Sequence, residues 1–486
     1  MASATIGARK RRRVAKKKPT IIAVSLRRHN HCVARTVIVV GAGAAGTFAG
    51  WRAATLGAQV TLLEKTNRIG TKILVSGGGK CNVAHAGTIE QLLAAFRPEE
   101  ARFLRPACYR LRNDQIVDLF TSRGLRVYTR PDGRVFPVDQ TAKDVVAIIR
   151  GYLDEAGVDV RLESPVTGLI IRDGRVEGVK VGQARTAAVR QAEQSGYRSN
   201  SATNLLREFE SVAVDAGASD SVLNADAVVI CCGGSSYPNS GTTGDGWAWA
   251  RGAGHTIVKV RAALAPLYLQ SVPDLSGVSL RDVRLRARQG KEIANWLGDL
   301  LFTHQGLSGP CALGVSGTVA EKMQTGPVNV EIDLSPDRSF EQISEDLVAY
   351  CSSFPLRLTS SFVEQLAPSR AVPLILESAK VPPDVSGSRL DKKARNRLAT
   401  ALKGWPLGAV RHVPLEKGEV VAGGVSLSEV DPHTMRSKLV SGLYLCGEIL
   451  DIAGPIGGYN LQAAFATGFV AGESAAKGKV PLSVEC

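Results

Sequence analysis

A glycine-rich turn between an apolar strand and a helix is the pattern that most restricts the fold of this chain. The run Thr36–Val40 is apolar and β-branched, as expected of a strand buried on both faces of a sheet. A helical pattern continues to about Leu56, and a second apolar run, Val60–Leu63, ends at Glu64. The turn before the helix has the spacing G-x-G-x-x-G, at Gly41, Gly43 and Gly46. This order of elements predicts a parallel, Rossmann-like nucleotide-binding sheet of the α/β class.

Each part of this unit has a role in dinucleotide binding. The glycines allow a tight turn and a close approach of backbone to a pyrophosphate, the helix N-terminus offers free N–H groups, and Glu64 accepts hydrogen bonds from ribose hydroxyls. The predicted contacts are Gly41, Gly43, Ala44, Ala45, Gly46, Glu64 and Lys65. A glycine-rich turn that arose by chance is the alternative, and the motif alone does not separate FAD from NAD.

A second glycine-rich segment favours FAD. Three consecutive glycines, Gly77–Gly79, follow closely after the ribose-binding acid. A nicotinamide dehydrogenase usually continues there with an ordinary βα unit, so we expect backbone laid along more of a longer cofactor. A flexible surface loop is the alternative explanation. The predicted contacts of this segment are Lys72, Gly78, Gly79 and Asn82.

Three later stretches repeat the pattern of a buried strand or turn followed by glycine. Ala225–Cys231 leads to Gly233 and Gly234, and Leu443–Leu445 leads to Gly447 and Glu448. A third stretch, with Gly458, Asn460 and Leu461, opens a helix of small residues whose N-terminus is suited to stabilise negative charge on a reduced flavin. Each stretch alone fits an ordinary strand and turn. Together they place cofactor signals at both ends of the chain and predict a discontinuous domain.

At this point the sequence resembles a known family, the BaiN/RdsA-like NAD(P)/FAD-dependent oxidoreductases, which are two-dinucleotide-fold flavoproteins. Seven blocks in order carry the resemblance: Val39–Gly46, Ser76–Asn82, Gly133–Pro137, Tyr237–Gly246, Phe302–Pro310, Gly423–Val425 and Gly442–Gln462. The resemblance implies a discontinuous FAD-binding domain, residues 36–260 and 419–480, interrupted by a mainly β substrate domain at residues 261–418. It also implies FAD as cofactor, NAD(P)H as electron donor, and Val166 as a further cofactor contact.

Two side chains are candidates for proton transfer to a substrate. Cys81 follows the triple glycine, and His304 lies among glycines in the predicted substrate domain. A cysteine in such a place is commonly a small packing residue, and a lone histidine is commonly structural. No metal site is expected, because no cysteine pair has metal-ligand spacing.

The charge of the chain is concentrated in its first residues. The 60 Lys and Arg exceed the 45 Asp and Glu by 15, but residues 1–35 hold 11 basic residues and no acid, which leaves +4 for the other 451 residues. We interpret residues 1–35 as a transit-peptide-like leader that addresses the protein to an organelle, a chloroplast first and a mitochondrion as the alternative. A nuclear localisation or nucleic-acid patch is the other explanation.

Away from the leader, two basic clusters lie in the predicted substrate domain, Arg281–Lys291 and Arg389–Arg411. They are either solvated surfaces or a phosphate-binding face for ribosomal RNA. Residues 183–221 are rich in Ala, Ser, Gln and Arg and predict a disordered inserted loop. No membrane span is expected, since the longest apolar stretch is broken by glycines, and the nine cysteines suit a reducing interior.

The sequence therefore predicts an enzyme that passes hydride from NAD(P)H through FAD to an activated C=C bond. The resemblance implies as substrate either a uridine of organellar ribosomal RNA, reduced to dihydrouridine, or a small conjugated enone. A flavin-binding protein without turnover is the alternative from another class, and a nuclear nucleic-acid binder is a third.

Overall fold

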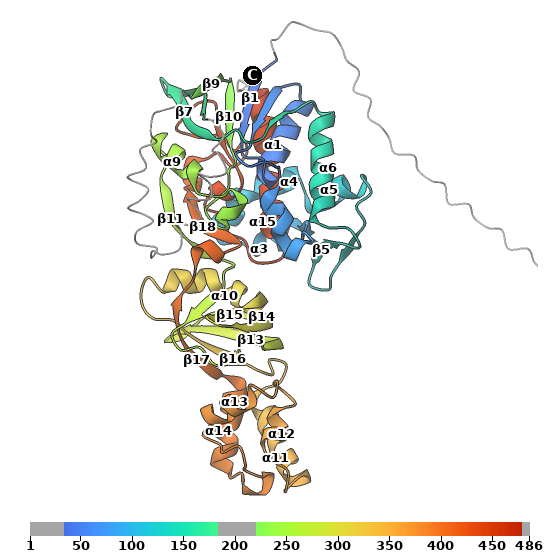
Figure 1. The fold of residues 1–486 in the computed structure, drawn as a ribbon, viewed down its shortest axis with the longest axis vertical. Helices are drawn as coiled ribbons and strands as arrows, with labels where there is room; N and C mark the ends of the chain where they lie inside the picture. Colours follow the sequence, from blue (N-terminus) through green and yellow to red (C-terminus); the bar gives the residue numbers. More distant parts are fainter. Residues whose placement is uncertain (1–33, 183–219, 479–486) are drawn as a thin grey trace, which may run out of the picture. The chain divides into compact units, whose positions relative to one another are not determined.

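The nucleotide-binding part is built on a parallel five-stranded sheet (Figure 1). The computed structural model describes residues 34–182 and 220–478. The strands of this sheet, in spatial order, are β19 (Leu443–Leu445), β10 (Ala227–Ile230), β1 (Thr36–Val40), β2 (Gln59–Leu63) and β6 (Asp159–Arg161). Every neighbouring pair in it is parallel. Because β10 lies between β1 and β19, three segments far apart in the sequence lie side by side in one sheet.

The first predicted unit is confirmed nearly residue by residue. The predicted strand Thr36–Val40 is β1, and the predicted helix is α1 (Ala44–Thr55), one residue shorter than expected at its end. The second predicted strand is β2, with one extra residue at its start. The discontinuous Rossmann-like domain is confirmed as well, because β19 pairs with β10 in the same sheet.

Helix α1 and helix α15 (Tyr459–Lys477) approach each other at backbone distance. A Cβ atom on Gly468 would lie 2.1 Å from the carbonyl oxygen of Ala45, and one on Gly472 would lie 2.1 Å from that of Ala49. Only glycine fits at these two positions, one helical turn apart. The small residues in the predicted C-terminal helix therefore serve this contact, and α15 also contacts β10.

Shorter elements surround the five-stranded sheet. The second sheet is antiparallel and consists of β7 (Val166–Arg172), β8 (Arg175–Val181) and β9 (Ser221–Asn224). Its middle strand, β8, contacts β10. A third small sheet consists of β3 (Ala84–His85), β5 (Arg134–Pro137) and β4 (Val127–Thr129). The other helices of this part are α2 (Thr71–Val75), α3 (Ile89–Ala94), α4 (Pro98–Arg110), α5 (Asn113–Thr121), α6 (Ala142–Glu155) and α9 (Asp245–Gly252).

The inserted part contains a closed antiparallel barrel, which confirms the predicted β insertion. Its strands, in spatial order, are β12 (Leu267–Leu269), β15 (Gly306–Ser308), β14 (Lys291–Thr303), β13 (Ser279–Gln289), β16 (Asn329–Asp333) and β17 (Trp405–His412). Helix α10 (Gly309–Lys322) contacts β13 and β14. The chain enters through β11 (Ile257–Ala263) and returns through β18 (Val420–Val425), which pair antiparallel. All six barrel strands lie within residues 261–418.

A group of helices interrupts the barrel between β16 and β17, and the sequence analysis did not predict it. Its members are α11 (Phe340–Ser353), α12 (Ser360–Val363), α13 (Val372–Ser378) and α14 (Lys392–Lys403). Helix α11 starts with a capping box, in which Ser339 Oγ accepts a hydrogen bond from the N–H of Gln342. Buried residues of these helices, such as Ile343 and Leu398, belong to the same hydrophobic core as the barrel.

Two predicted regions fall largely outside the described residues. These are the leader at 1–35, of which 34 and 35 are described, and the loop at 183–221, of which 220 and 221 are described. Both remain predictions. Within residues 34–182 and 220–478, no helix has the length and apolar character needed to cross a bilayer.

A carboxylate on α15 joins three helices of the nucleotide-binding part. Glu473 accepts hydrogen bonds from Arg52 on α1 and Arg110 on α4, and it pairs with Lys477. Burial alone would raise the pKa of Glu473, but the hydrogen bonds from Arg110, Lys477 and Arg52 outweigh this effect and lower the pKa to about 2. Because the folded pKa lies below the ordinary value of 4.5, the ionised carboxylate stabilises the fold above that pH and this contribution is lost as the pH falls toward 2.

We therefore expect Glu473→Gln to lower the free energy of unfolding by about 1–3 kcal/mol at pH 7, the range for hydrogen bonds to charged groups. The difference from wild type should shrink between about pH 5 and pH 2, since protonation removes the same charge. Asp154→Asn, which breaks the exposed pair with Arg150 on α6, is the control and should cost less than about 1 kcal/mol. Urea unfolding across this pH range measures the free energy of unfolding of both variants. An equal loss of stability in the two variants would contradict the prediction.

Candidate functional site

A cavity of about 480 Å³ lies where β1, β10 and β19 end and where α1 and α15 begin. Carboxyl ends of parallel strands are the usual ligand site of an open α/β sheet, and this volume is within the ordinary range of cofactor pockets. Sixteen of the predicted cofactor contacts line the cavity: Gly41, Gly43, Ala44, Ala45, Glu64, Lys65, Lys72, Gly78, Asn82, Val166, Gly233, Gly447, Glu448, Gly458, Asn460 and Leu461. Their contact with a cofactor remains a prediction.

The glycine-rich turn leaves the N-terminus of α1 open to the cavity. A Cβ atom on Gly46 would lie 1.8 Å from the carbonyl oxygen of Gly41, so this position requires glycine to keep the turn tight. A Cβ atom on Gly43 would meet no atom within 4 Å, and the first turn of α1 holds no acidic residue. Free N–H groups and the positive end of the helix dipole therefore face open space, which suits a pyrophosphate.

Two residues at the end of β2 shape the next part of the wall. Glu64 accepts hydrogen bonds from the backbone N–H groups of Ala42 (2.9 Å) and Thr66 (2.8 Å). A carboxylate has about four acceptor positions, so it retains capacity for ribose hydroxyls. Lys65 pairs with Asp245 at 2.6 Å, which ties β2 to the start of α9.

An ion pair spans the cavity wall between α2 and the turn after β19. Lys72 Nζ lies 2.6 Å from Glu448 Oε2 and donates to Ser236 Oγ at 2.8 Å. The other oxygen of Glu448 accepts from the N–H of Val421 on β18 at 3.0 Å. Two charged side chains that are distant in the sequence therefore form an ion pair at the cavity.

The N-terminus of α15 is held by side chains around the loop 454–458. The side chain of Asn460 both accepts from and donates to the backbone of Gly454 at 2.8 Å. His85 stacks on Tyr459, and its two ring nitrogens lie 3.0 Å from the Tyr459 hydroxyl and from the carbonyl oxygen of Gly457. This loop is thereby fixed at the cavity, and a second helix N-terminus points to the same ligand site.

Five predicted residues do not line the cavity. Gly46, Gly79 and Gly234 lie behind or beside its wall; a Cβ on Gly234 would meet Val421 Cγ2 at 2.4 Å, so it serves close packing. Cys81 is fully buried in the hydrophobic core, and burial raises its pKa to about 11, an effect that a hydrogen bond with Ser76 opposes in part. His304 is exposed on the turn between β14 and β15. The structure thus brings neither proposed proton donor to the cavity.

Other wall residues were missed by the sequence analysis. They include Thr71, Arg130, Arg134, Tyr237, Thr242, Asp245 and Glu419. Several lie in the sequence blocks quoted for the family resemblance, and that was the available signal. Glu419 lies four residues before such a block. Burial raises the pKa of Glu419, and the charge of Lys72 acts against this effect.

The residues present fit a dinucleotide cofactor. Apart from the two helix N-termini, Thr71 Oγ1 is buried at the cavity and has no hydrogen-bond partner among the described residues. A buried hydroxyl without a partner is costly unless a ligand satisfies it. Within the described residues, no group of three or more His, Cys, Asp or Glu is arranged to hold a metal ion.

A parallel sheet interrupted by an antiparallel barrel, with a cavity lined from both ends of the chain, is an arrangement suited to a long dinucleotide cofactor. The chain belongs to the HI0933-like family, since the model described as HI0933-like protein Rossmann domain matches residues 35–192 and 186–474. This confirms the predicted family, and with it the predicted enzyme class and FAD as cofactor.

Three relatives align over nearly the whole chain. The 3-dehydro-bile acid delta(4,6)-reductase of Clostridium scindens is 29% identical over 445 residues, which are 90% of this chain and 98% of that protein. The ribosomal RNA dihydrouridine synthase of Haemophilus influenzae is 28% identical and covers 89% of this chain and 96% of its own length. The synthase of the same name from Escherichia coli is 27% identical, with coverages of 88% and 95%.

The packing of the glycine-rich turn gives a test of the cofactor site. Gly46→Ala places a methyl group against the carbonyl of Gly41, and overpacking of this kind costs about 1–3 kcal/mol, so we expect roughly 10- to 100-fold weaker FAD binding. Gly50→Ala on the same helix is the matched control, because its Cβ would meet only side chains at 3.7 Å or more. The ratio of flavin to protein absorbance after dialysis measures the effect, and equal flavin content in both variants would contradict it.

Proposed function

We propose that this protein reduces the C5=C6 bond of a uridine in ribosomal RNA to dihydrouridine, with NAD(P)H as the electron donor. The observation that carries the proposal is the alignment of 89% and 88% of this chain with two ribosomal RNA dihydrouridine synthases. The third relative is named as the reductase of a bile acid. The names of all three are consistent with reduction of a carbon–carbon double bond.

Bound FAD supplies the hydride for such a reduction. The chain itself contributes the open N-terminus of α1 for the pyrophosphate, Glu64 for the ribose, and the Lys72–Glu448 pair in the wall. NAD(P)H as donor is supported by the family resemblance alone, and the choice between NADH and NADPH is part of the test below.

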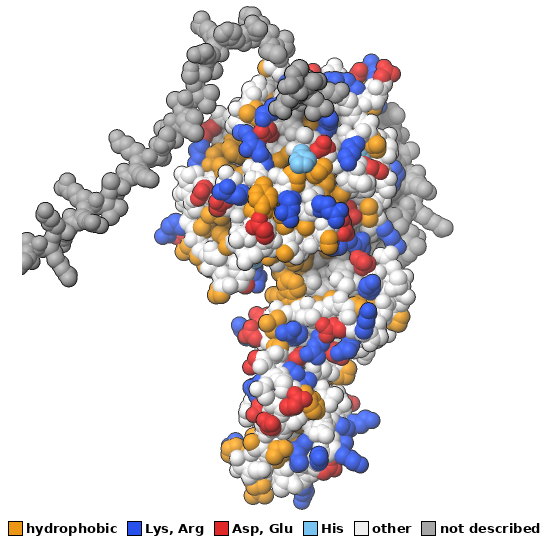
Figure 2. Space-filling model, turned by 180° about the vertical axis from the view of Figure 1, so that it is seen from behind, with side chains coloured by type: hydrophobic (Ala, Val, Ile, Leu, Met, Phe, Trp, Pro, Cys, Tyr) orange, Lys and Arg blue, Asp and Glu red, His pale blue; other side chains and the backbone are white. Residues whose placement is uncertain are grey.

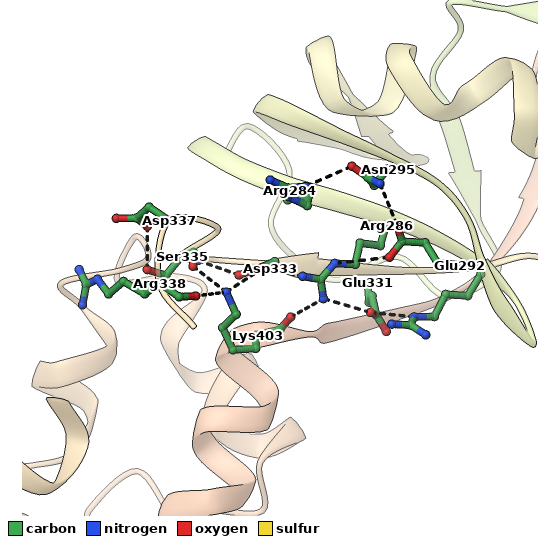
Figure 3. A network of polar contacts seen from close by, with 11 residues as sticks. Arg284, Arg286, Glu292, Asn295, Glu331, Asp333, Ser335, Asp337, Arg338 and Lys403 are labelled. Carbon is green, nitrogen blue, oxygen red and sulfur yellow. Dashed lines mark hydrogen bonds and ion pairs between the residues drawn. The ribbon is translucent and has the colours of Figure 1, made fainter. Parts of the chain in front are cut away.

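The first basic cluster, Arg281–Lys291, is partly used inside the fold (Figure 3). Asp333 is buried, and its Oδ2 lies 2.7 Å from Arg286 Nη2 and 2.9 Å from Lys403 Nζ. Arg288 pairs with Glu331 at 2.8 Å. These cations are neutralised within the protein, so they are poor candidates for phosphate binding.

Other members of both clusters remain available to a polyanion. Arg281, Lys291, Lys392 and Lys393 are exposed, and none of them forms an ion pair with a carboxylate in the described part of the chain. Figure 2 shows basic and acidic side chains mixed over one face of the molecule. We therefore assign RNA contact to a few separate cations on the insert, which position a substrate by its phosphates.

Reduction of a small conjugated enone is the second candidate, and the bile acid reductase supports it. A flavin-binding protein without turnover and a nuclear nucleic-acid binder are less well supported, because the full-length relatives are named as enzymes. The organellar location of the substrate is part of the proposal and rests only on the basic composition of residues 1–35.

Ribosomal RNA from cells with and without this protein gives the direct test. We expect organellar ribosomal RNA from the deletion strain to lack one dihydrouridine that is present in wild type, while cytosolic ribosomal RNA is unchanged. Nucleoside mass spectrometry measures this difference. The purified flavoprotein should restore the dihydrouridine with NADH or NADPH, and the two donors are compared directly. If the deletion leaves all dihydrouridine in place, the RNA proposal fails, and turnover of 2-cyclohexen-1-one with NAD(P)H would then favour the enone reductase.

The exposed cations give a second test. Replacing Arg281, Lys291, Lys392 and Lys393 with Gln should lower the slope of log affinity against log salt by about 3, since each phosphate contact contributes about 0.7–0.9. The matched control replaces four exposed cations of the nucleotide-binding part, Arg102, Lys143, Lys180 and Arg251. Filter binding of ribosomal RNA between 50 and 200 mM KCl compares the two fourfold variants. Equal slopes would show that the four cations of the insert do not contact the RNA.

A further inference from the structure

Glu419 occupies a distinctive place in the cavity. It directly precedes β18, where the chain returns from the barrel, and its N–H donates to the carbonyl oxygen of Leu264 at 3.0 Å. Both residues line the cavity. Leu264 directly follows β11, so Glu419 lies where the two strands that connect the barrel to the nucleotide-binding part meet the ligand site.

Four carboxylates line the cavity, and three of them are fixed by partners. Glu64 accepts two backbone N–H groups, Asp245 pairs with Lys65, and Glu448 pairs with Lys72. The side chain of Glu419 forms no hydrogen bond or ion pair with any side chain or backbone group of the described residues. The residue is exposed and lines the cavity.

The charges near Glu419 leave it able to hold a proton. Burial raises its pKa, and the one charge that opposes this effect is that of Lys72. Lys72 Nζ is itself bound 2.6 Å from Glu448 Oε2, so much of its positive charge is already balanced. A raised pKa and the lack of a salt bridge are features expected of a carboxyl group that acts as a proton donor.

We propose that Glu419 is the general acid that protonates the substrate carbon when hydride is delivered to the other carbon of the double bond. This assignment rests on the proposed reduction of a C=C bond. It replaces Cys81, which is buried outside the cavity, and His304, which is exposed on the barrel.

The π bond of the substrate breaks, and one carbon forms a C–H bond with the hydride, whose two electrons come ultimately from NAD(P)H. The other carbon forms a C–H bond with the proton of Glu419, and the O–H bond of the carboxylic acid breaks to leave a carboxylate. Glu419 regains a proton from water before the next turnover, and NAD(P)⁺ and the saturated product are released.

The main experiment compares Glu419→Gln with a matched control in the loaded flavoprotein. Glu416→Gln removes an equal charge three residues earlier, from an exposed side chain that does not line the cavity. We expect Glu419→Gln to retain its flavin, to be reduced by NAD(P)H within about twofold of wild type, and to pass electrons to ferricyanide equally well. Reduction of the C=C probe, either ribosomal RNA from the deletion strain or 2-cyclohexen-1-one, should fall by about 10²–10⁴-fold, the range of general acid catalysis. Glu416→Gln should match wild type in every assay.

A second readout needs neither cofactor nor activity. Because the folded pKa of Glu419 is raised, ionising it costs stability, and this cost appears as the pH rises above 4.5, the ordinary value. The apoprotein of Glu419→Gln should therefore melt at the same temperature as wild type below about pH 4.5 and at a higher temperature at pH 8. Glu416→Gln should show no such pH-dependent gain.

The outcomes separate this assignment from the proposed function. If wild type reduces neither C=C probe, the proposed function fails and the assignment of a proton donor fails with it. If wild type turns over and Glu419→Gln does so within about threefold, only the assignment falls. Tyr237 also lines the cavity and carries a hydroxyl group. A large loss of C=C reduction in Tyr237→Phe, with little loss in Glu419→Gln, would assign the proton donor to Tyr237 instead. Loss of ferricyanide reduction in Glu419→Gln, or the absence of the pH-dependent gain in melting temperature, would also overturn it.

Discussion

The contact between α1 and α15 at backbone distance is the constraint on which the ligand site depends. Each of these helices starts at the cavity, so their separation sets the distance between the two N-termini that face a cofactor. Gly468 and Gly472 permit that separation on one side, and Gly46 keeps the turn before α1 tight on the other. The positive ends of two helix dipoles therefore face one cavity, a geometry that suits a negatively charged ligand.

The sequence was sufficient where structure is local. The strand, turn, helix and strand of residues 36–63 form contacts within about 30 residues. Their sequence pattern therefore predicts the structure of this unit almost completely. Repeated glycine signals at both ends of the chain predicted a discontinuous domain, but not that β10 lies between β1 and β19. The barrel strands were not individually predicted, because their pairing is set by contacts between distant residues, and the helices at 340–403 were missed although Ser339 and Gln342 form a capping box.

The candidate site was predictable to the same extent. The spacing of the glycines and of the acid after β2 predicts their place in a nucleotide-binding site, and most of them line the cavity. The chemistry of a proton donor depends instead on burial and on the absence of partners, which spacing does not encode. Cys81 and His304 are reactive residue types in suitable motifs, yet one lies in the core and the other on the surface. Arg286 and Lys403 likewise belong to basic stretches, but the buried Asp333 makes them structural.

The interleaved order of the central sheet has a consequence for how the protein is made. β1 leaves the ribosome first, its neighbour β10 follows nearly 200 residues later, and β19 and α15 come only after the whole barrel has been synthesised. The barrel closes from strands of one continuous stretch and can fold as a unit during translation, whereas the nucleotide-binding sheet must wait with an unpaired edge. Because α15 supplies part of the cavity wall, a cofactor can meet the complete site only after α15 has docked, and its binding then stabilises the assembled sheet against reopening.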